Sequence, residues 1–226
     1  MIYENITRAV FRKRLNRFAA EVDTDGHTET VHVKNTGRLK ELLISGAEVW
    51  LTAPGTTGRK TEYDLVAVRK ENGMLFNIDS QAANAVVKEW LAGQDYSAVI
   101  PEYTYGDSRI DFYMEKDAGK EEPGRFLLEV KGCTLEKDGI GYFPDAPTQR
   151  GVKHIRELMK AVKEGYGAVL AFVMQADGIR EVRPNSATHP EFASAMEEAE
   201  KAGVKIWFFA CHVRPDGLLI KAKYEK

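Results

Sequence analysis

Cysteine and long apolar runs are scarce in this chain, and each shortage excludes a class of protein. Its two cysteines, Cys133 and Cys211, lie 78 positions apart and form no CxxC pair. A disulfide framework is therefore excluded, and a reducing cytoplasm is the expected location. No run approaches ~18 apolar residues, and no apolar signal region follows the basic N-terminal segment, so we expect neither membrane spanning nor secretion.

The chain also lacks an excess of charge and several spacings that mark enzyme or DNA-binding families. Its 32 basic residues nearly balance 34 acidic ones, so binding to nucleic acid would have to come from a local patch. The five histidines show no zinc-ligand spacing with the cysteines. There is no G-x-S-x-G elbow, P-loop, dinucleotide fingerprint or helix-turn-helix signature. Sequence-specific reading of DNA by a helix is therefore hard to derive from these residues.

The pattern of apolar and polar residues divides the chain into two regions. Residues 1–80 form short apolar segments separated by turns, with a brief helix expected near 38–44. About five such strands predict a small closed β-barrel of the OB type, although an SH3-like barrel would produce a similar pattern. Residues 81–226 mix helices with apolar strands, which predicts an α/β domain with a mixed central sheet. The overall class is therefore α/β, or α+β for the whole chain.

The second region contains clear helix and strand signals. Asp145 is expected to cap its second helix, with Pro147 in the first turn. A continuous apolar run after that helix is typical of a strand buried on both faces. The expected elements are helices over 81–93, 148–165 and 189–203 and strands over 97–105, 108–114, 125–132, 167–174 and 204–213.

Charged residues interrupt two of these strands in a way that alternation can explain. Asp111 lies on one face of the first strand, and Glu129 and Lys131 share one face of the second. If the strands pair as a hairpin around 115–124, the two carboxylates lie side by side with Lys131 two residues further. Neighbouring carboxylates repel unless a cation neutralises them, so a hard cation, Mg²⁺ or Mn²⁺, is predicted. The alternative is a solvated face with alternating charge, and the Glu-Val-Lys tripeptide alone does not decide.

The surrounding segments resemble a known family. The stretches HVKNTGRLKELL, RIDF, LLEVKGCTL and GYFPDAPTQRGVKHIREL are similar to the sugar fermentation stimulation protein (SfsA) family, over essentially the whole chain. The order helix–strand–strand–strand–helix–strand also resembles the core of PD-(D/E)XK nucleases. The resemblance implies an OB-like N-terminal domain, a nuclease-like C-terminal domain, DNA binding, and a link to expression of sugar (maltose) utilisation genes. One departure is His189, where an Asp is expected.

The resemblance also assigns roles at the paired strands. Asp111 and Glu129 correspond to the metal-binding carboxylates, and the backbone carbonyl of Val130 would be a further ligand of Mg²⁺ or Mn²⁺. Lys131 corresponds to the lysine that helps to orient or activate the attacking water. The chemistry implied is metal-assisted hydrolysis of a phosphodiester bond.

Further residues are candidates for support or for contact with nucleic acid, with solvated surface positions as the alternative in each case. Residues four apart on the helix over 148–165 share a side of it and flank its apolar stripe. A basic N-terminal segment and the turn after it would contact phosphates in the manner of OB-type barrels. Supporting candidates are Asn84, Glu89, Asp145 and Gln149. Nucleic-acid candidates are Arg12, Arg14, Arg17, Asn35, Arg38, Arg150, Lys153 and His154.

Three functions are consistent with these features. The first is a metal-dependent nuclease that binds DNA, centred on Asp111, Glu129 and Lys131. The second is a non-catalytic DNA-binding regulator that retains a nuclease-like scaffold. The third is a metal-dependent hydrolase of small phosphorylated molecules, which would leave the barrel without a role. The oligomeric state stays open, with a homodimer among the alternatives.

Overall fold

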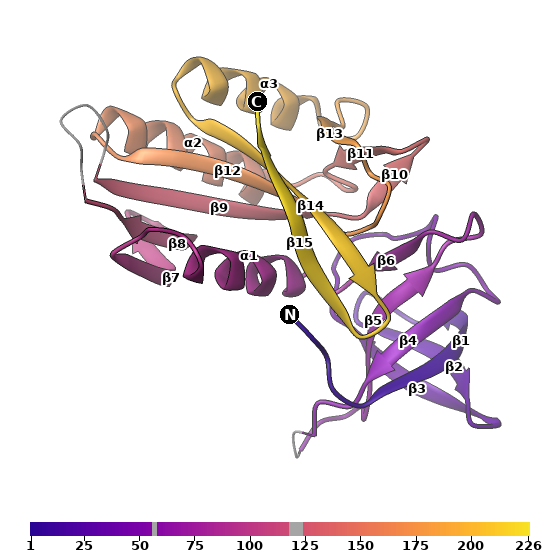
Figure 1. Cartoon of the computed structure of the whole chain (residues 1–226). Coiled ribbons are helices and arrows are strands. Elements are labelled where there is room, and N and C mark those ends of the chain that lie inside the picture. The colour runs from indigo at the N-terminus through magenta and orange to yellow at the C-terminus, as the bar shows by residue number, and fades with distance from the viewer. Residues whose placement is uncertain (56–57, 118–123) are drawn as a thin grey trace.

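The chain forms two domains that pack against each other. The computed structural model describes residues 1–55, 58–117 and 124–226, so the expected hairpin turn over 115–124 lies largely outside the described residues. In Figure 1 the first domain is a barrel and the second is a sheet with helices on both faces. The long β14–β15 hairpin of the second domain runs back to the barrel, close to the N-terminus.

The first domain is the OB-type barrel that the sequence predicts. Its strands follow the order β3-β2-β1-β4-β5-β6, and a parallel pairing of β3 with β5 closes the barrel. The expected helix near 38–44 is wrong: turns replace it, and Leu39 has a φ of +48°, which interrupts a helix. The strands are β1 Ile6–Arg14, β2 Ala19–Thr24, β3 His27–Val33, β4 Glu48–Thr52, β5 Asp64–Arg69 and β6 Leu75–Asn77.

The second domain contains the expected mixed sheet. Its strand order is β15-β14-β12-β9-β8-β7, in which β9, β12 and β14 run parallel to one another. A smaller sheet, β10-β11-β13, follows the end of β9. The helices are α1 Ala82–Ala92, α2 Gln149–Lys163 and α3 Pro190–Lys201. The strands are β7 Ala98–Tyr105, β8 Ser108–Glu115, β9 Arg125–Cys133, β10 Leu135–Lys137, β11 Ile140–Phe143, β12 Gly167–Met174, β13 Glu181–Pro184, β14 Lys205–Arg214 and β15 Gly217–Glu225.

The two faces of the central sheet are covered by different helices. Helix α1 packs on one face, where Phe112 and Leu128 are buried, and α2 and α3 pack on the other, where Leu127 is buried. Strict alternation along β8 fails at one point, because Ile110 joins the α2 side of the core although Phe112 joins the α1 side. Asp111 lies between these two residues, at the point where the alternation fails.

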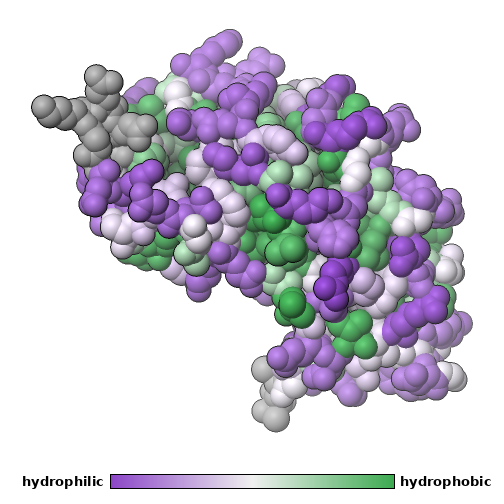
Figure 2. Space-filling model, viewed as in Figure 1, coloured by the Kyte–Doolittle hydropathy of each residue, from purple (hydrophilic) through white to green (hydrophobic). Residues whose placement is uncertain are grey.

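A buried polar junction joins the domains. The side-chain amide of Gln175, just beyond β12, donates to Asn77 Oδ1 at 3.0 Å and to the carbonyl of Asp79 at 2.9 Å. Lys70 of the barrel side forms an ion pair with the buried Glu136 of β10 at 2.6 Å. Figure 2 shows that hydrophilic residues cover most of this face, whereas hydrophobic ones gather at the waist between the domains. The relative position of barrel and sheet is thus fixed by both apolar and polar contacts.

Arg14, at the end of β1, organises the segment of the barrel that faces the second domain. All five of its guanidinium N–H groups donate to backbone carbonyls. Arg12, two residues earlier, is exposed, and its guanidinium donates to the side chains of Asp23 and Thr28. The carbonyls that Arg14 holds are those of Asn16, Arg17, Asn35, Gly37 and Arg38.

This difference between two arginines of one strand can be tested by parallel substitutions. We expect Arg14→Lys to lower the free energy of unfolding by about 2 kcal/mol, because an ammonium cannot reproduce the planar five-donor fork. Arg12→Lys is the matched control and should change it by less than about 0.5 kcal/mol. Urea unfolding followed by tryptophan fluorescence measures both values, and equal values would contradict the organising role of Arg14.

Candidate functional site

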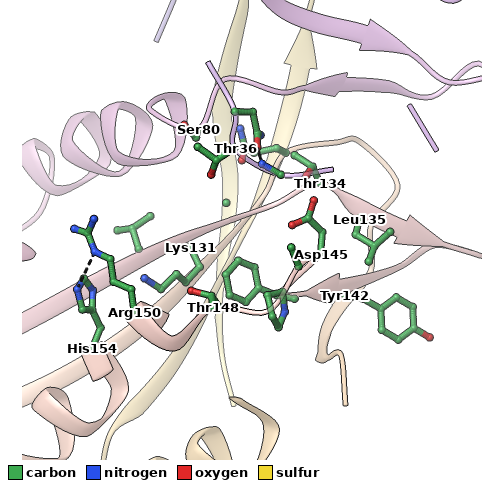
Figure 3. A pocket seen from close by; sticks show the side chains of 18 of the residues that line it. Thr36, Ser80, Lys131, Thr134, Leu135, Tyr142, Asp145, Thr148, Arg150 and His154 are labelled. Carbon is green, nitrogen blue, oxygen red and sulfur yellow. Dashed lines mark hydrogen bonds between the residues drawn. The ribbon is translucent and has the colours of Figure 1, made fainter. Parts of the chain in front are cut away.

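A cavity of about 550 Å³ lies between the two domains. The barrel contributes the 35–37 turn, α1 contributes Asn84, and β8, β9 and α2 contribute the charged residues. Figure 3 shows side chains of the barrel side and the α2 side facing each other across this space. The predicted site residues that line it are Arg17, Asn35, Asn84, Asp111, Glu129, Val130, Lys131, Asp145, Arg150 and His154.

Glu129 is the most deeply placed charge in the cavity. Its side chain is 2% exposed, and its Oε1 accepts hydrogen bonds from Lys131 Nζ and His154 Nδ1. Its Oε2 is buried and has no hydrogen-bond partner among the described residues. Glu129 and Lys131 share one face of β9, as expected from alternation, and that face is the α2 side of the sheet. In Figure 3 Lys131 extends toward Arg150 and His154.

Asp111 lies where β8 separates from β9. The residue pairs between these strands end at Phe112 and Leu128, so Asp111 stands at the next position, toward Glu129. Its carboxylate accepts a backbone hydrogen bond of β9, as a carbonyl of a paired strand would. Oδ2 accepts from the backbone N–H of Val130 at 2.7 Å. Its Oδ1 accepts from Asn84 Nδ2 at 2.7 Å. The hairpin interpretation therefore brings the two carboxylates into one cavity, with Asn84 holding the first.

The two carboxylates differ in their readiness to ionise. Burial raises the pKa of Asp111, and the nearby charge of Glu129 raises it further. Burial acts in the same direction on Glu129, but Lys131 and His154 outweigh it, and the pKa of Glu129 is lowered. Glu129 is thus the firmly ionised member of the pair. Full ionisation of Asp111 beside it would be favoured by a further positive charge.

The donor set fits a hard divalent cation better than a soft metal. Two carboxylates with an unpartnered buried oxygen match the oxygen ligands that Mg²⁺, Mn²⁺ and Ca²⁺ take. Burial raises the pKa of both cysteine thiols to about 12, which keeps them protonated. Within the described ranges, no group of three or more His, Cys, Asp or Glu side chains is placed to hold a metal. A cation here would take further ligands from backbone, water or substrate oxygens.

Helix α2 presents one of its two polar flanks to the cavity. Arg150 and His154 line it, and Arg150 Nε donates to His154 Nε2 at 3.3 Å. The other flank is used elsewhere: Gln149 donates to Glu191 Oε2 at 3.0 Å, and Lys153 donates to the carbonyl of Asp107 at 3.0 Å. The two candidates on that second flank therefore hold neighbouring elements and do not line the cavity.

The start of α2 differs from the expectation. Thr148 caps the helix, and its hydroxyl accepts from the N–H of Gly151 at 3.0 Å, so the expected cap by Asp145 is wrong. Asp145 instead accepts from the backbone N–H of Arg38 at 2.8 Å, and its carbonyl accepts from Arg38 Nε at 2.9 Å. Gly37 permits this approach, since a Cβ there would lie 2.5 Å from Asp145 Oδ2. The loop before α2 is thus tied to the barrel.

Other candidates are not part of the cavity wall. Glu89 forms an ion pair with the N-terminal amine at 2.6 Å. Basic side chains of β1 form ion pairs with acidic side chains of β2. Arg12 contacts Asp23 at 3.3 Å, and Lys13 contacts Glu21 at 3.2 Å. Arg17, just after β1, is the basic residue of this segment that lines the cavity.

Several cavity residues were not identified from the sequence. Thr36 and Ser80 line the barrel side and are labelled in Figure 3. Gln175 also lines the cavity. A Cβ on Gly132 would overlap the Gln175 side chain, so the glycine after Lys131 is required by this packing. Gly132 is the one feature of the sequence that could have indicated close packing at this point. It does not indicate which residue packs there, and Gln175 is 43 residues further along the chain.

None of the helices in the described part of the chain has the length and apolar character needed to span a bilayer.

Comparison with known proteins places the chain in a family. Residues 81–217 match the family model described as the sugar fermentation stimulation protein RE domain, and residues 13–78 match the SfsA N-terminal OB domain. A sugar fermentation stimulation protein homolog of Desulfitobacterium hafniense is 47% identical over 221 residues, covering 96% of this chain and 94% of the relative. The homolog of Clostridium beijerinckii is 44% identical over 225 residues, covering 98% and 97%.

A solved structure is similar over nearly the whole length. It is the structure of Pyrococcus furiosus SfsA in complex with Ca²⁺, with a TM-score of 0.86 and 26% sequence identity, covering 99% of this chain and 96% of that one. Both domains of the chain therefore have the arrangement of this relative. On the evidence of the two family models and the curated relatives, the chain belongs to the sugar fermentation stimulation protein family.

Proposed function

We propose that this protein binds DNA and hydrolyses its phosphodiester bonds with the help of Mg²⁺ or Mn²⁺, as a nuclease of the PD-(D/E)XK type. The observation that carries the proposal is the buried Glu129 carboxylate, which has one oxygen held by Lys131 and His154 and the other without a partner in the described chain. Asp111 lies beside it in the same cavity. Asp111 is half-buried and Glu129 is buried, and the charge of Glu129 opposes ionisation of Asp111, an arrangement that a bound cation would favour.

Three groups of the chain would hold the cation: the carboxylates of Asp111 and Glu129 and the carbonyl of Val130. The Ca²⁺ complex of the Pyrococcus furiosus relative supports a hard divalent cation in this fold. When bound, such an ion polarises a phosphate oxygen and lowers the pKa of a coordinated water. Asn84 would keep the Asp111 carboxylate in place through its hydrogen bond at 2.7 Å.

Lys131 and the arginines at the cavity would act on the phosphate. Lys131 is 14% exposed, so its ammonium faces the site with little competition from bulk water. It would orient the attacking water and stabilise the negative charge that develops on the phosphate. Arg17 of the barrel and Arg150 of α2 line the same cavity from different domains and would bind flanking phosphates.

Loss of a predicted metal ligand, or of the lysine that would orient the attacking water, should strongly slow hydrolysis without unfolding the protein. We expect Asp111→Asn and Lys131→Met to reduce the rate of DNA cleavage in Mg²⁺ or Mn²⁺ by about 100-fold or more. Cleavage of labelled single-stranded, double-stranded and branched DNA, and of RNA, measures the effect on gels. Glu89→Gln is the matched control, because this carboxylate pairs with the N-terminal amine away from the cavity.

The same assay separates the nuclease from a DNA-binding regulator. If the wild-type protein cleaves none of the substrates with either metal but still binds DNA, the nuclease proposal fails and the regulatory function gains support. Cleavage that persists in Asp111→Asn would point to a contaminating nuclease.

We infer that DNA would contact the residues that line the cavity, Arg17 among them. We expect Arg17→Ala to reduce the slope of log K against log salt concentration by about 1, because one phosphate contact is lost. Arg12→Ala should leave the slope unchanged, since Arg12 already faces Asp23. Fluorescence anisotropy of labelled DNA in EDTA measures both slopes without cleavage. A larger effect of Arg12→Ala would move the interface to the outer face of the barrel.

A further inference from the structure

The two oxygens of the Glu129 carboxylate have different surroundings. Oε1 accepts from both Lys131 Nζ and His154 Nδ1, while Oε2 is buried without a hydrogen-bond partner in the described residues. The side chains of Glu129 and His154 are 2% and 7% exposed, so water does not readily replace either contact. Both fixed donors act on one oxygen, which leaves the lone pairs of the other available to a ligand.

The hydrogen bonds of His154 define which ring nitrogen carries the proton. Arg150 Nε donates to His154 Nε2 at 3.3 Å. An arginine Nε–H is a donor at any ordinary pH and cannot accept, so Nε2 must be the acceptor. The ring proton therefore lies on Nδ1, the nitrogen that faces Glu129. The pattern is self-consistent: one nitrogen accepts from a cation, and the other donates to an anion.

Helix α2 builds this arrangement from its periodicity. Arg150 and His154 are four residues apart and share one side of the helix, and Figure 3 shows the hydrogen bond between them. His154 is buried against Glu129, whereas Arg150 is exposed. An exposed arginine thereby fixes the tautomer of a buried histidine.

We propose that His154 is a positioning residue for the site: held in its Nδ1–H tautomer by Arg150, it fixes Oε1 of Glu129 so that Oε2 is presented to a divalent cation. This inference rests on the proposed role of Glu129 as a metal ligand. It assigns His154 to the carboxylate, in place of the contact with nucleic acid expected from the sequence. The competing explanation is that His154 is only a packed core residue whose hydrogen bonds are incidental.

The tautomer is tested on the metal-free full-length protein by long-range ¹H–¹⁵N NMR of the histidine rings at one fixed pH. His154→Gln identifies its signal among the five histidines. We expect the Nδ1–H tautomer in the wild type and a shift toward the other tautomer in Arg150→Met, which removes the donor to Nε2. Any other protonation pattern in the wild type, or no change in Arg150→Met, would overturn the proposal.

Metal affinity is tested by calorimetric titration with Ca²⁺, which needs no turnover. In His154→Asn the side-chain amide nitrogen occupies the place of Nδ1, so the donor to Glu129 is kept. In His154→Gln it occupies the place of Nε2, so that donor is lost. We expect affinity within about threefold of wild type for the first and about 10–100-fold weaker for the second. His212→Gln, an exposed histidine paired with Asp177, is the control and should bind as the wild type does.

The outcomes separate this inference from the proposed function. Equal Ca²⁺ affinities of His154→Asn and His154→Gln, with a wild type that binds, would overturn the positioning role alone. A wild type that binds none of Ca²⁺, Mg²⁺ and Mn²⁺ would refute the proposed function and this inference together. If thermal unfolding shows His154→Gln to be unfolded, Arg150→Met decides: this substitution at an exposed position should weaken Ca²⁺ binding, and unchanged affinity would overturn the proposal.

Discussion

The burial of the Glu129 carboxylate is the constraint on which the rest of the site depends. A charge in the centre of a sheet costs several kcal/mol unless close partners compensate it. Lys131 supplies one partner from the same strand face, and His154 supplies the other from α2. The second contact requires α2 to start at a particular place and angle. The loop before α2, which forms one wall of the cavity, is placed as a consequence.

The same constraint explains why the barrel is an integral part of the site. Arg14 shapes the barrel turn through backbone carbonyls, and that turn holds Asp145 through Arg38. Asp145 precedes the capping residue of α2 by three positions, and α2 carries His154 to Glu129. A continuous series of hydrogen bonds and covalent segments thus leads from the barrel to the carboxylate. The position of the barrel relative to the sheet therefore bears on the position of the Glu129 carboxylate.

Periodic features could be predicted from the sequence, and features set by distant partners could not. Strand spacing predicted the OB barrel, and alternation in β8 and β9 brought Asp111 toward Glu129 and Lys131. The break of alternation at Asp111 depends on how β8 leaves β9, which no local pattern encodes. Arg14 was interpreted as a phosphate contact because OB-type barrels bind nucleic acid through basic segments, yet its donors are engaged by carbonyls up to 24 residues away. Such assignments require the packed structure.

Charge placement offers the last argument about function. The chain carries a net charge of −2, and acidic side chains offset much of the basic strand β1. The outer barrel surface is therefore a poor general attractor of DNA. The cavity itself is lined by three basic residues, Arg17, Lys131 and Arg150. A phosphate bound to these groups would lie beside Asp111 and Glu129, and two carboxylates repel a phosphate unless a cation lies between them. Under the proposed function, a bound divalent cation would relieve this repulsion, so phosphate binding in the cavity would be coupled to metal binding.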